Sequence, residues 1–363
     1  MPRGWRSYFG LLEEVGTQGI PELNAWGGQS GTVTESFLYF DSETMAEANE
    51  QRFLSEIGYT GTSDRSVKKH RVYGKKCEGS VTFTVYPEGG TNKDFLGLLL
   101  KHALCDYRKA PGTGPAGTYS GYGTYLHTFY GHDDWMEHLW NVGTGTGAYG
   151  LTVHVGREAT NGTVNDYPYI GCRIRRITFS CAAGEELKCT VEFVGRLAQS
   201  DTTALSPAYP TMDPFLWKDA TFQICTAEDG SGGTTREIDA FTITIDNALT
   251  ENYVLGTNTL ARTTCGAQRI VTGSFTAPFE TWVRDEQQKW KDGTVSGVNI
   301  KFDTGAYVLE FRMPNIYYTG NPPSISDVGE NIIELPFQAT LKTTFDLKVN
   351  FVNTDTYFGI LRS

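Results

Sequence analysis

The chain has 363 residues, 39% of them hydrophobic, and its 31 basic and 42 acidic residues give a net charge of −11. Its longest unbroken apolar stretch, Phe95 to Leu100, is far shorter than the ~20 residues of a membrane-spanning helix, and no apolar segment typical of a secretory signal follows the N-terminus. The negative charge argues against binding to nucleic acid through phosphate contacts, because Lys and Arg supply most of the free energy of such binding.

Most of the chain alternates apolar and polar residues with a period of two, which predicts half-buried strands and a mainly β fold. Gly, Asn, Pro and Ser separate the alternating segments and favour turns there. In chain order, the predicted strands are Ser36–Asp41, Ser80–Tyr86, Leu151–Val155, Cys172–Ser180, Leu187–Val194, Thr221–Cys225, Ile238–Ile245, Ile270–Thr276, Val298–Phe302, Tyr307–Tyr318, Ile332–Phe337 and Phe345–Phe351.

Two segments predict helices instead. The first is Asp94–Leu104, capped by Asn92 or by its own first residue, with large apolar residues on one side. The second is Glu280–Lys291, which begins after Pro278 with acidic residues and ends before Gly293.

Similar segments occur twice in the same order, which predicts an internal duplication. The matched pairs are Glu35–Asp41 with Asp239–Asp246, Glu78–Phe83 with Thr272–Thr276, and Arg173–Ile177 with Arg312–Ile316. We therefore expect two tandem β domains, residues 1–200 with an N-terminal arm and residues 201–363. The alternative is two unrelated β domains whose strands look alike.

Seven cysteines form no C-x-x-C pair, and their number is odd. This pattern argues against a disulfide framework and against a zinc ribbon. We expect reduced, mostly buried thiols that pack as small apolar side chains.

The richest polar cluster is His127–His138, with three imidazoles and three carboxylates. Its spacing does not fit H-E-x-x-H, and Gly131 with two following aspartates indicates a turn between an aromatic strand and a short helix. Gly143–Gly150 is rich in glycine but precedes a strand, so it offers no helix N-terminus to a phosphate. We expect no metal, no cofactor and no catalytic residues.

One basic segment stands out against the acidic average. It comprises Arg65, Lys68, Lys69, Arg71, Lys75 and Lys76. Such a segment can be a solvated loop or touch nucleic acid, but in an assembly it would complement an acidic patch on a neighbouring copy. We therefore predict these residues at a subunit interface.

The residue order resembles that of the major tail tube proteins of long-tailed bacteriophages of the siphophage type, in the form that carries the tube fold twice. The segments that carry the resemblance are Tyr8–Gly10 with Glu14, Phe37–Asp41, Glu78–Phe83, Gly171–Phe179, Phe241–Leu249 and Arg269–Phe275. The loop Ser42–Cys77 and the glycine-rich segment Lys109–Gly123 have no obvious counterpart in the second half.

The resemblance implies a structural protein of the virion tail, assembled in the host cytoplasm. Each half would be a β-sandwich or barrel-like unit flanked by a helix, and three chains would form a pseudo-hexameric ring that stacks into a tube. About 24 inner strands, tilted by ~40°, give a backbone diameter of ~48 Å, so a duplex ~20 Å wide passes an acidic wall without binding. The implied partners are copies of the chain, the tape-measure protein, tail terminator and distal tail proteins, and double-stranded DNA in transit, with no membrane.

Two other functions stay open at this point. A tandem β-sandwich could bind carbohydrate or a receptor, with exposed aromatic rings stacking on sugars. An enzyme ranks behind it and would require that hydrolysis depends on His132 or Asp133.

Overall fold

Two long strands, β9 (Val164–Ala182) and β20 (Val308–Tyr318), organise the fold, because each of them belongs to two sheets. The computed structural model describes residues 6–16, 36–54, 69–87, 95–110, 125–131, 147–199, 202–225, 233–256, 260, 262–320, 332–342 and 345–353.

In the first half, the N-terminal part of β9 belongs to one sheet and its C-terminal part belongs to another. The sheet that contains the N-terminal part is here called the first flanking sheet. The first flanking sheet has the order β2 (Ser36–Leu38), β1 (Tyr8–Gly16), β8 (Gly147–Glu158), β9, with β11 (Leu197–Ala198) and β12 (Thr202–Thr203) on its far edge. The other sheet has the order β3 (Ser42–Glu43) with β4 (Ala46–Leu54), then β5 (Lys69–Thr84), β10 (Lys188–Gly195) and β9.

The second half repeats these pairings around β20. Its flanking sheet has the order β14 (Thr234–Arg236), β13 (Ala220–Cys225), β19 (Ser296–Asp303), β20, β22 (Lys348–Asn353), β7 (Tyr125–Gly131), β6 (Cys105–Ala110). The other sheet has the order β15 (Ala240–Asp246), β18 (Ile270–Pro278), β21 (Ile332–Ala339), β20.

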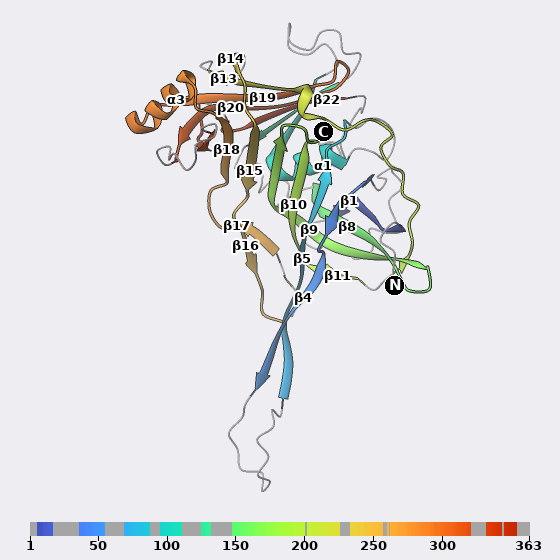
Figure 1. Ribbon diagram of the computed structural model, residues 1–363. Helices are drawn as coiled ribbons and strands as arrows, with labels where there is room; N and C mark the ends of the chain where they lie inside the picture. The colour runs from blue at the N-terminus through green and yellow to red at the C-terminus, as the bar shows by residue number, and fades with distance from the viewer. Residues whose placement is uncertain are drawn as a thin grey trace.

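The two halves join through a direct strand pair. Strand β15 pairs antiparallel with the C-terminal part of β9, from Ala240 opposite Ala182 to Asp246 opposite Arg176. The result is one continuous sheet, here called the central sheet, in the order β3–β5–β10–β9–β15–β18–β21–β20, part of which is visible in Figure 1.

One face of the central sheet packs on the core of both halves. Since side chains alternate between the faces of a strand, a single register places apolar residues level with one another. One such buried row runs through Val81, Val191, Ile177, Ile245, Val271 and Ala339. These residues belong to one core cluster that also includes Phe179 and Phe311, whose ring centroids lie 4.9 Å apart.

The two predicted helices occur and differ in their surroundings. Helix α1 (Phe95–Leu104) is buried on all sides, which corrects the expected one-sided apolar face. Helix α3 (Thr281–Asp292) is amphipathic and buries Trp282 and Val283. Glu280 stands at its N-cap, and Gly293 ends it in the left-handed conformation with φ 64°, where glycine avoids the steric penalty of a Cβ atom.

All twelve predicted strands occur, and the structure adds others. The predicted loop Ser42–Cys77 is wrong, since β3, β4 and the first half of β5 lie within it. The hairpin β6–β7 comes from the first half of the chain but pairs with β22 of the second, so it crosses the predicted boundary at residue 200. A short hairpin, β16 (Leu249–Asn252) and β17 (Arg262–Cys265), and a 3-10 turn, η2 (Trp217–Asp219), complete the described elements.

The cysteines whose side chains are described are free and buried, as predicted. Cys77 Sγ and Cys172 Sγ lie 4.0 Å apart under Gly195, where an added Cβ atom would come within 2.5 Å of both sulfurs. Among the described residues, no helix has the length and apolarity that crossing a membrane requires.

Candidate assembly surfaces

The second face of the central sheet is polar and dominated by hydroxyl groups. A row of residues lies level across the whole sheet and is here called the threonine row: Ser42, Thr82, Thr190, Thr178, Thr244, Thr272, Gln338 and Tyr317. Hydroxyl groups of neighbours interact, with Thr82 Oγ1 3.0 Å from Thr190 Oγ1 and Thr178 Oγ1 3.1 Å from Thr244 Oγ1. The β-branched side chain of Thr suits a pleated surface, and its hydroxyl keeps that surface polar.

The sequence itself carries a signal for this row. Ser or Thr recurs at every second position in Ser80–Thr84, Thr242–Thr244 and Thr272–Thr276. Their alignment across both halves depends on the strand register, which only the structure provides.

Several charged residues on the polar face contact an opposite charge. The Arg176 guanidinium donates to Asp246 Oδ2 at 2.8 and 3.2 Å and to Glu192 Oε1 at 3.3 Å, so one cation meets two carboxylates. Burial alone would raise the pKa of Asp246, but the hydrogen bonds from Arg176 and the Ala248 N–H, together with the charges of Arg176 and Arg175, outweigh it and lower that pKa. Lys188 Nζ lies 2.9 Å from Asp41 Oδ2. Because Arg176 lies in β9 and Asp246 lies in β15, their ion pair also links the two halves across the junction.

Both ends of the central sheet are open edges. Among the described strands, β3 and β4 pair only with β5, and Tyr317 and Tyr318 of β20 pair only with β21. In the first half, the C-terminal part of β9 takes the place that Tyr317 and Tyr318 have in the second half. It pairs with β10 on one side and with β15 on the other. Unpaired strand edges are ready to accept a strand from another chain.

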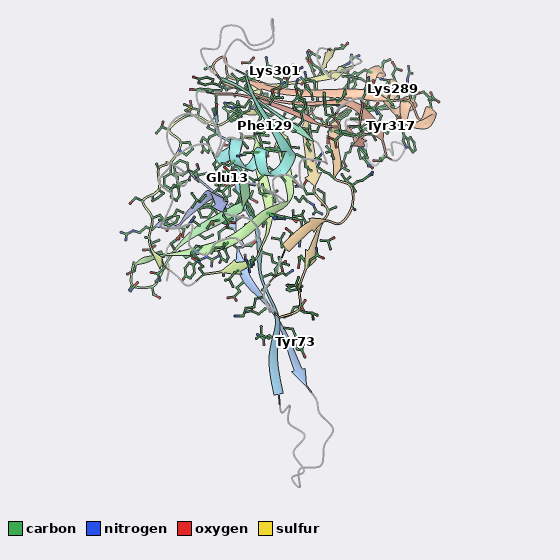
Figure 2. The ribbon with its side chains drawn as sticks, turned by 180° about the vertical axis from the view of Figure 1, so that it is seen from behind. Glu13, Tyr73, Phe129, Lys289, Lys301 and Tyr317 are labelled. Atoms are coloured by element: carbon green, nitrogen blue, oxygen red, sulfur yellow. The ribbon has the colours of Figure 1, made fainter. Side chains whose placement is uncertain are left out.

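The hairpin of β4 and β5 projects from the body of the molecule, as Figure 1 shows. Residues 77–84 of β5 pair with β10, whereas among the described strands residues 69–76 pair only with β4. At ~3.4 Å per residue, this projecting part, here called the hairpin arm, is about 25 Å long. Tyr73, labelled on it in Figure 2, is 41% exposed.

The hairpin β16–β17 supports the base of the arm. Lys76 Nζ contacts Glu251 Oε2 at 3.0 Å and Glu78 Oε2 at 2.8 Å. Burial would lower the pKa of Lys76, but these two carboxylates outweigh it and raise that pKa. The ring of Tyr253 lies against Gly74, where an added Cβ atom would come within 3.2 Å of the ring.

Four of the six residues predicted at a subunit interface lie in β5. Arg65 and Lys68 lie outside the described residues, while Lys69 and Arg71 lie in β5. Lys75 is half-buried, and Lys76 is paired within its own chain. Their role at an interface stays a prediction, and for Lys76 part of its charge is already matched by Glu78 and Glu251.

One electrostatic cluster is buried and structural. Glu13 Oε1 accepts hydrogen bonds from Lys101 Nζ at 2.7 Å and from His102 Nε2 at 2.8 Å, which ties β1 to α1. Burial would raise the pKa of Glu13, but Lys101 and His102 outweigh it and lower that pKa to about 2. Burial lowers the pKa of His102, so its ring is neutral at pH 7.

The next residue, Glu14, is also buried but has no such cation. Its Oε1 accepts from the Gly171 N–H at 2.7 Å and from Thr152 Oγ1 at 2.9 Å, whereas its buried Oε2 has no hydrogen-bond partner. Burial raises the pKa of Glu14, and these hydrogen bonds only partly offset the shift. Neither glutamate reaches solvent, so neither is placed to act on a substrate.

The residues weighed for metal binding or hydrolysis are only partly described. His127 is fully buried in β7, and residues 132–138 lie outside the described residues. Within the described ranges, no group of His, Cys, Asp and Glu is arranged to hold a metal ion. A cavity of about 320 Å³ between η2, β13 and β15 has Trp217, Phe222 and Phe241 among its lining residues.

The family model described as phage tail tube protein matches residues 28–339, well over half of the chain. The match runs through both halves and ends at Ala339, the last residue of β21. No curated protein matches the chain.

Proposed function

Because the chain belongs to the phage tail tube protein family, whose members are structural components of the bacteriophage virion, we propose that it polymerises as stacked trimeric, pseudo-hexameric rings. The rings enclose a channel through which the genome leaves the virion. Membership of a structural family favours a role without catalysis, and it favours the tube over the alternative of a carbohydrate-binding module.

One observation carries this proposal: the chain already contains a junction of the kind that a ring requires. Strands β9 and β15 pair side by side and make the sheets of the two halves continuous. The equivalent edge of β20 and the outer edge of β3 and β4 have no partner among the described strands. A β20 edge paired with the β3–β4 edge of the next copy repeats the internal junction and removes both open edges.

The repeated pairings support a duplicated tube fold. Strands β1, β8, β9, β10 and β5 pair in the first half as β13, β19, β20, β21 and β18 pair in the second. Two such units in each chain make six equivalent positions in a ring of three chains. A closed point group with three copies is therefore the smallest ring that gives pseudo-sixfold symmetry.

The strand register gives an estimate of the width of the channel. If Gly79 of β5 and Gly273 of β18 occupy equivalent positions in the two halves, the offset between them along the strands is the register shift of one half relative to the next. Gly79 lies opposite Phe193, whereas Gly273 lies level with Phe83, four residues further along β5, after four strand-to-strand steps. One residue per strand corresponds to a tilt of ~35°, and about 24 strands with that tilt close at a backbone diameter of ~45 Å. Side chains narrow it to about 35 Å, which admits a duplex ~20 Å wide.

The finer assignments belong to this proposal as well. We infer a tail of the siphophage type, assembly in the host cytoplasm around a tape-measure protein, and terminal contacts with tail terminator and distal tail proteins. The family match supports the coarser statement that the chain assembles with other components of a phage tail.

Negative-stain electron microscopy of the purified protein tests the proposal. Rings or hollow tubes with threefold symmetry are expected, and a monomer that persists at high concentration would contradict it. The substitution Tyr317→Lys places a charge on the open β20 edge and is expected to prevent rings, since edge lysines oppose strand pairing. Phe279→Lys is the matched control, because Phe279 and Tyr317 are similarly exposed, at 41% and 38%, but Phe279 lies between β18 and α3, on neither the open edges nor the arm. If Tyr317→Lys forms rings as well as the control does, this edge is not the junction.

A further inference from the structure

The chain carries an apolar projection at one end and an apolar cavity at the other. The projection is the end of the hairpin β16–β17, residues 253–255, here called the apolar tip, and the cavity is the one between η2, β13 and β15. Resting on the proposed stack of rings, we propose that the apolar tip of each chain enters this cavity on a chain of the next ring.

Three consecutive apolar residues are exposed at the apolar tip. Tyr253 is 40% exposed, Val254 is 45% exposed, and Leu255 is completely exposed. Gly256 follows with a φ of 93°, a positive value that glycine adopts without the steric penalty of a Cβ atom. Isolated apolar residues are common on protein surfaces, but a continuous exposed run is expected only where it has a function, such as contact with another molecule.

The cavity offers an apolar surface of suitable size. Its volume is about 320 Å³, whereas an apolar cavity of ~150 Å³ already holds a benzene-sized molecule. Phe222 and Phe241 contribute to its lining, and so does Trp217, which is 50% exposed in a single chain. The aliphatic side chains of Val254 and Leu255 therefore have both the room and the apolar surroundings that their burial requires.

Strand β15 connects the two features and separates them. Its first residues, Ala240 and Phe241, line the cavity, and beyond its last residue, Asp246, the chain continues into β16. At ~3.4 Å per residue, these seven residues span about 20 Å. Figure 1 shows β16, β17 and the hairpin arm toward one end of the molecule, with β13 and β14 at the other. The apolar tip therefore meets a cavity on another chain, and such a heterologous contact repeats without closing, as a stack requires.

The charges of the two ends are complementary as well. The arm strands, β4 and residues 69–76 of β5, carry five basic and two acidic residues, a net charge of +3. The segments at the cavity, residues 183–187, 217–219 and 235–239, carry five acidic and two basic residues, a net charge of −3. Opposite charges select which ends meet, while the apolar tip supplies the buried area. The occupant that fits the cavity is accordingly a second copy of this chain.

One substitution on the apolar tip tests whether stacking depends on it. Val254→Asp is expected to leave single rings intact and to raise the protein concentration needed for tubes by about tenfold or more, because a carboxylate replaces a buried apolar side chain. Val295→Asp is the matched control, since Val254 and Val295 are similarly exposed, at 45% and 40%, but Val295 lies between α3 and β19 and does not line the cavity. Sedimentation and negative-stain microscopy over a concentration series distinguish rings from tubes.

Chemical cross-linking tests whether the apolar tip and the cavity meet. In tubes that carry both Leu255→Cys and Trp217→Cys, a short bis-maleimide is expected to join chains of successive rings and to give a ladder on a denaturing gel that extends beyond three chains. Each single variant is expected to give no ladder, since the described native thiols are buried. Tyr73→Cys combined with Trp217→Cys tests the hairpin arm as the occupant instead. A ladder from that combination and none from Leu255→Cys with Trp217→Cys would overturn the proposal.

The outcomes separate this inference from the proposed function. If the wild-type chain forms neither rings nor tubes, the proposed function fails and this inference fails with it. If wild-type tubes form and Val254→Asp assembles into tubes as readily as Val295→Asp does, the tube stands and the role assigned to the apolar tip is wrong.

Discussion

Two adjacent glutamates in β1 have opposite electrostatic environments, and exchanging each for glutamine separates their effects. Glu13→Gln removes the carboxylate that Lys101 and His102 contact at 2.7 and 2.8 Å. The pKa of Glu13 is about 2 instead of 4.5, and at 1.36 kcal/mol per pKa unit this difference corresponds to about 3 kcal/mol of stability. Removing one partner of a buried ion pair costs a similar ~3 to 5 kcal/mol, because it leaves a charge buried without compensation.

Glu14→Gln is the matched control, one residue further along the same strand. Burial raises the pKa of Glu14, so the folded chain favours its neutral form, and an amide is close to that form in shape and charge. The carbonyl oxygen of Gln can still accept from the Gly171 N–H and from Thr152. We therefore expect a change in stability below about 1 kcal/mol.

Urea unfolding of the unassembled chain, followed by tryptophan fluorescence, measures both variants. Glu13 has a lowered pKa, so its contribution is fully present above about pH 4.5 and is lost as the pH falls toward 2. The gap between wild type and Glu13→Gln should accordingly be widest near pH 7 and should narrow below pH 4.5. Equal losses in the two variants, or a gap that does not change with pH, would refute the electrostatic argument.

Three further substitutions test packing and the junction between the halves through the midpoint of thermal unfolding. Gly195→Ala should cost about 1 to 3 kcal/mol, because the new methyl group meets two buried sulfurs at 2.5 Å, and an unchanged midpoint would mean that the thiols can move aside. Leu99→Ala in the fully buried helix α1 should cost about 2 to 5 kcal/mol, and a smaller loss would show that the core collapses into the cavity. Asp246→Asn should cost less than about 1 kcal/mol, since the side chain of its partner Arg176 is 44% exposed, and a larger loss would assign the ion pair a greater share of the junction.

The period of apolar residues and the helix-capping residues predicted the strands and helices that have a buried face. Strands such as Thr221–Cys225 and Ile238–Ile245 alternate clearly because one side of each packs on the core. The helix that ends at Gly293 was equally visible, since a glycine in the left-handed conformation is a strong stop signal.

The sequence did not predict elements whose partners lie far away in the chain. The arm strand Ala46–Leu54 is mostly polar, and as one side of a two-stranded ribbon it has no buried face to impose alternation. The all-round burial of α1 also escaped prediction, because Lys101 and His102 are buried only where Glu13, some ninety residues earlier, supplies their partner. The threonine row depends in the same way on register between strands of both halves.

The pairing of β9 with β15 has a consequence for how faithfully rings can form. In the proposed ring of three chains, every second joint is made when a chain folds, at an effective concentration set by the tether and independent of protein concentration. Slippage by one residue would turn the side chains of a strand to the wrong face, and within the chain the buried residues on both strands forbid it. Mistakes in assembly are thereby confined to the three remaining joints, which halves the number of places where a growing tail can go wrong.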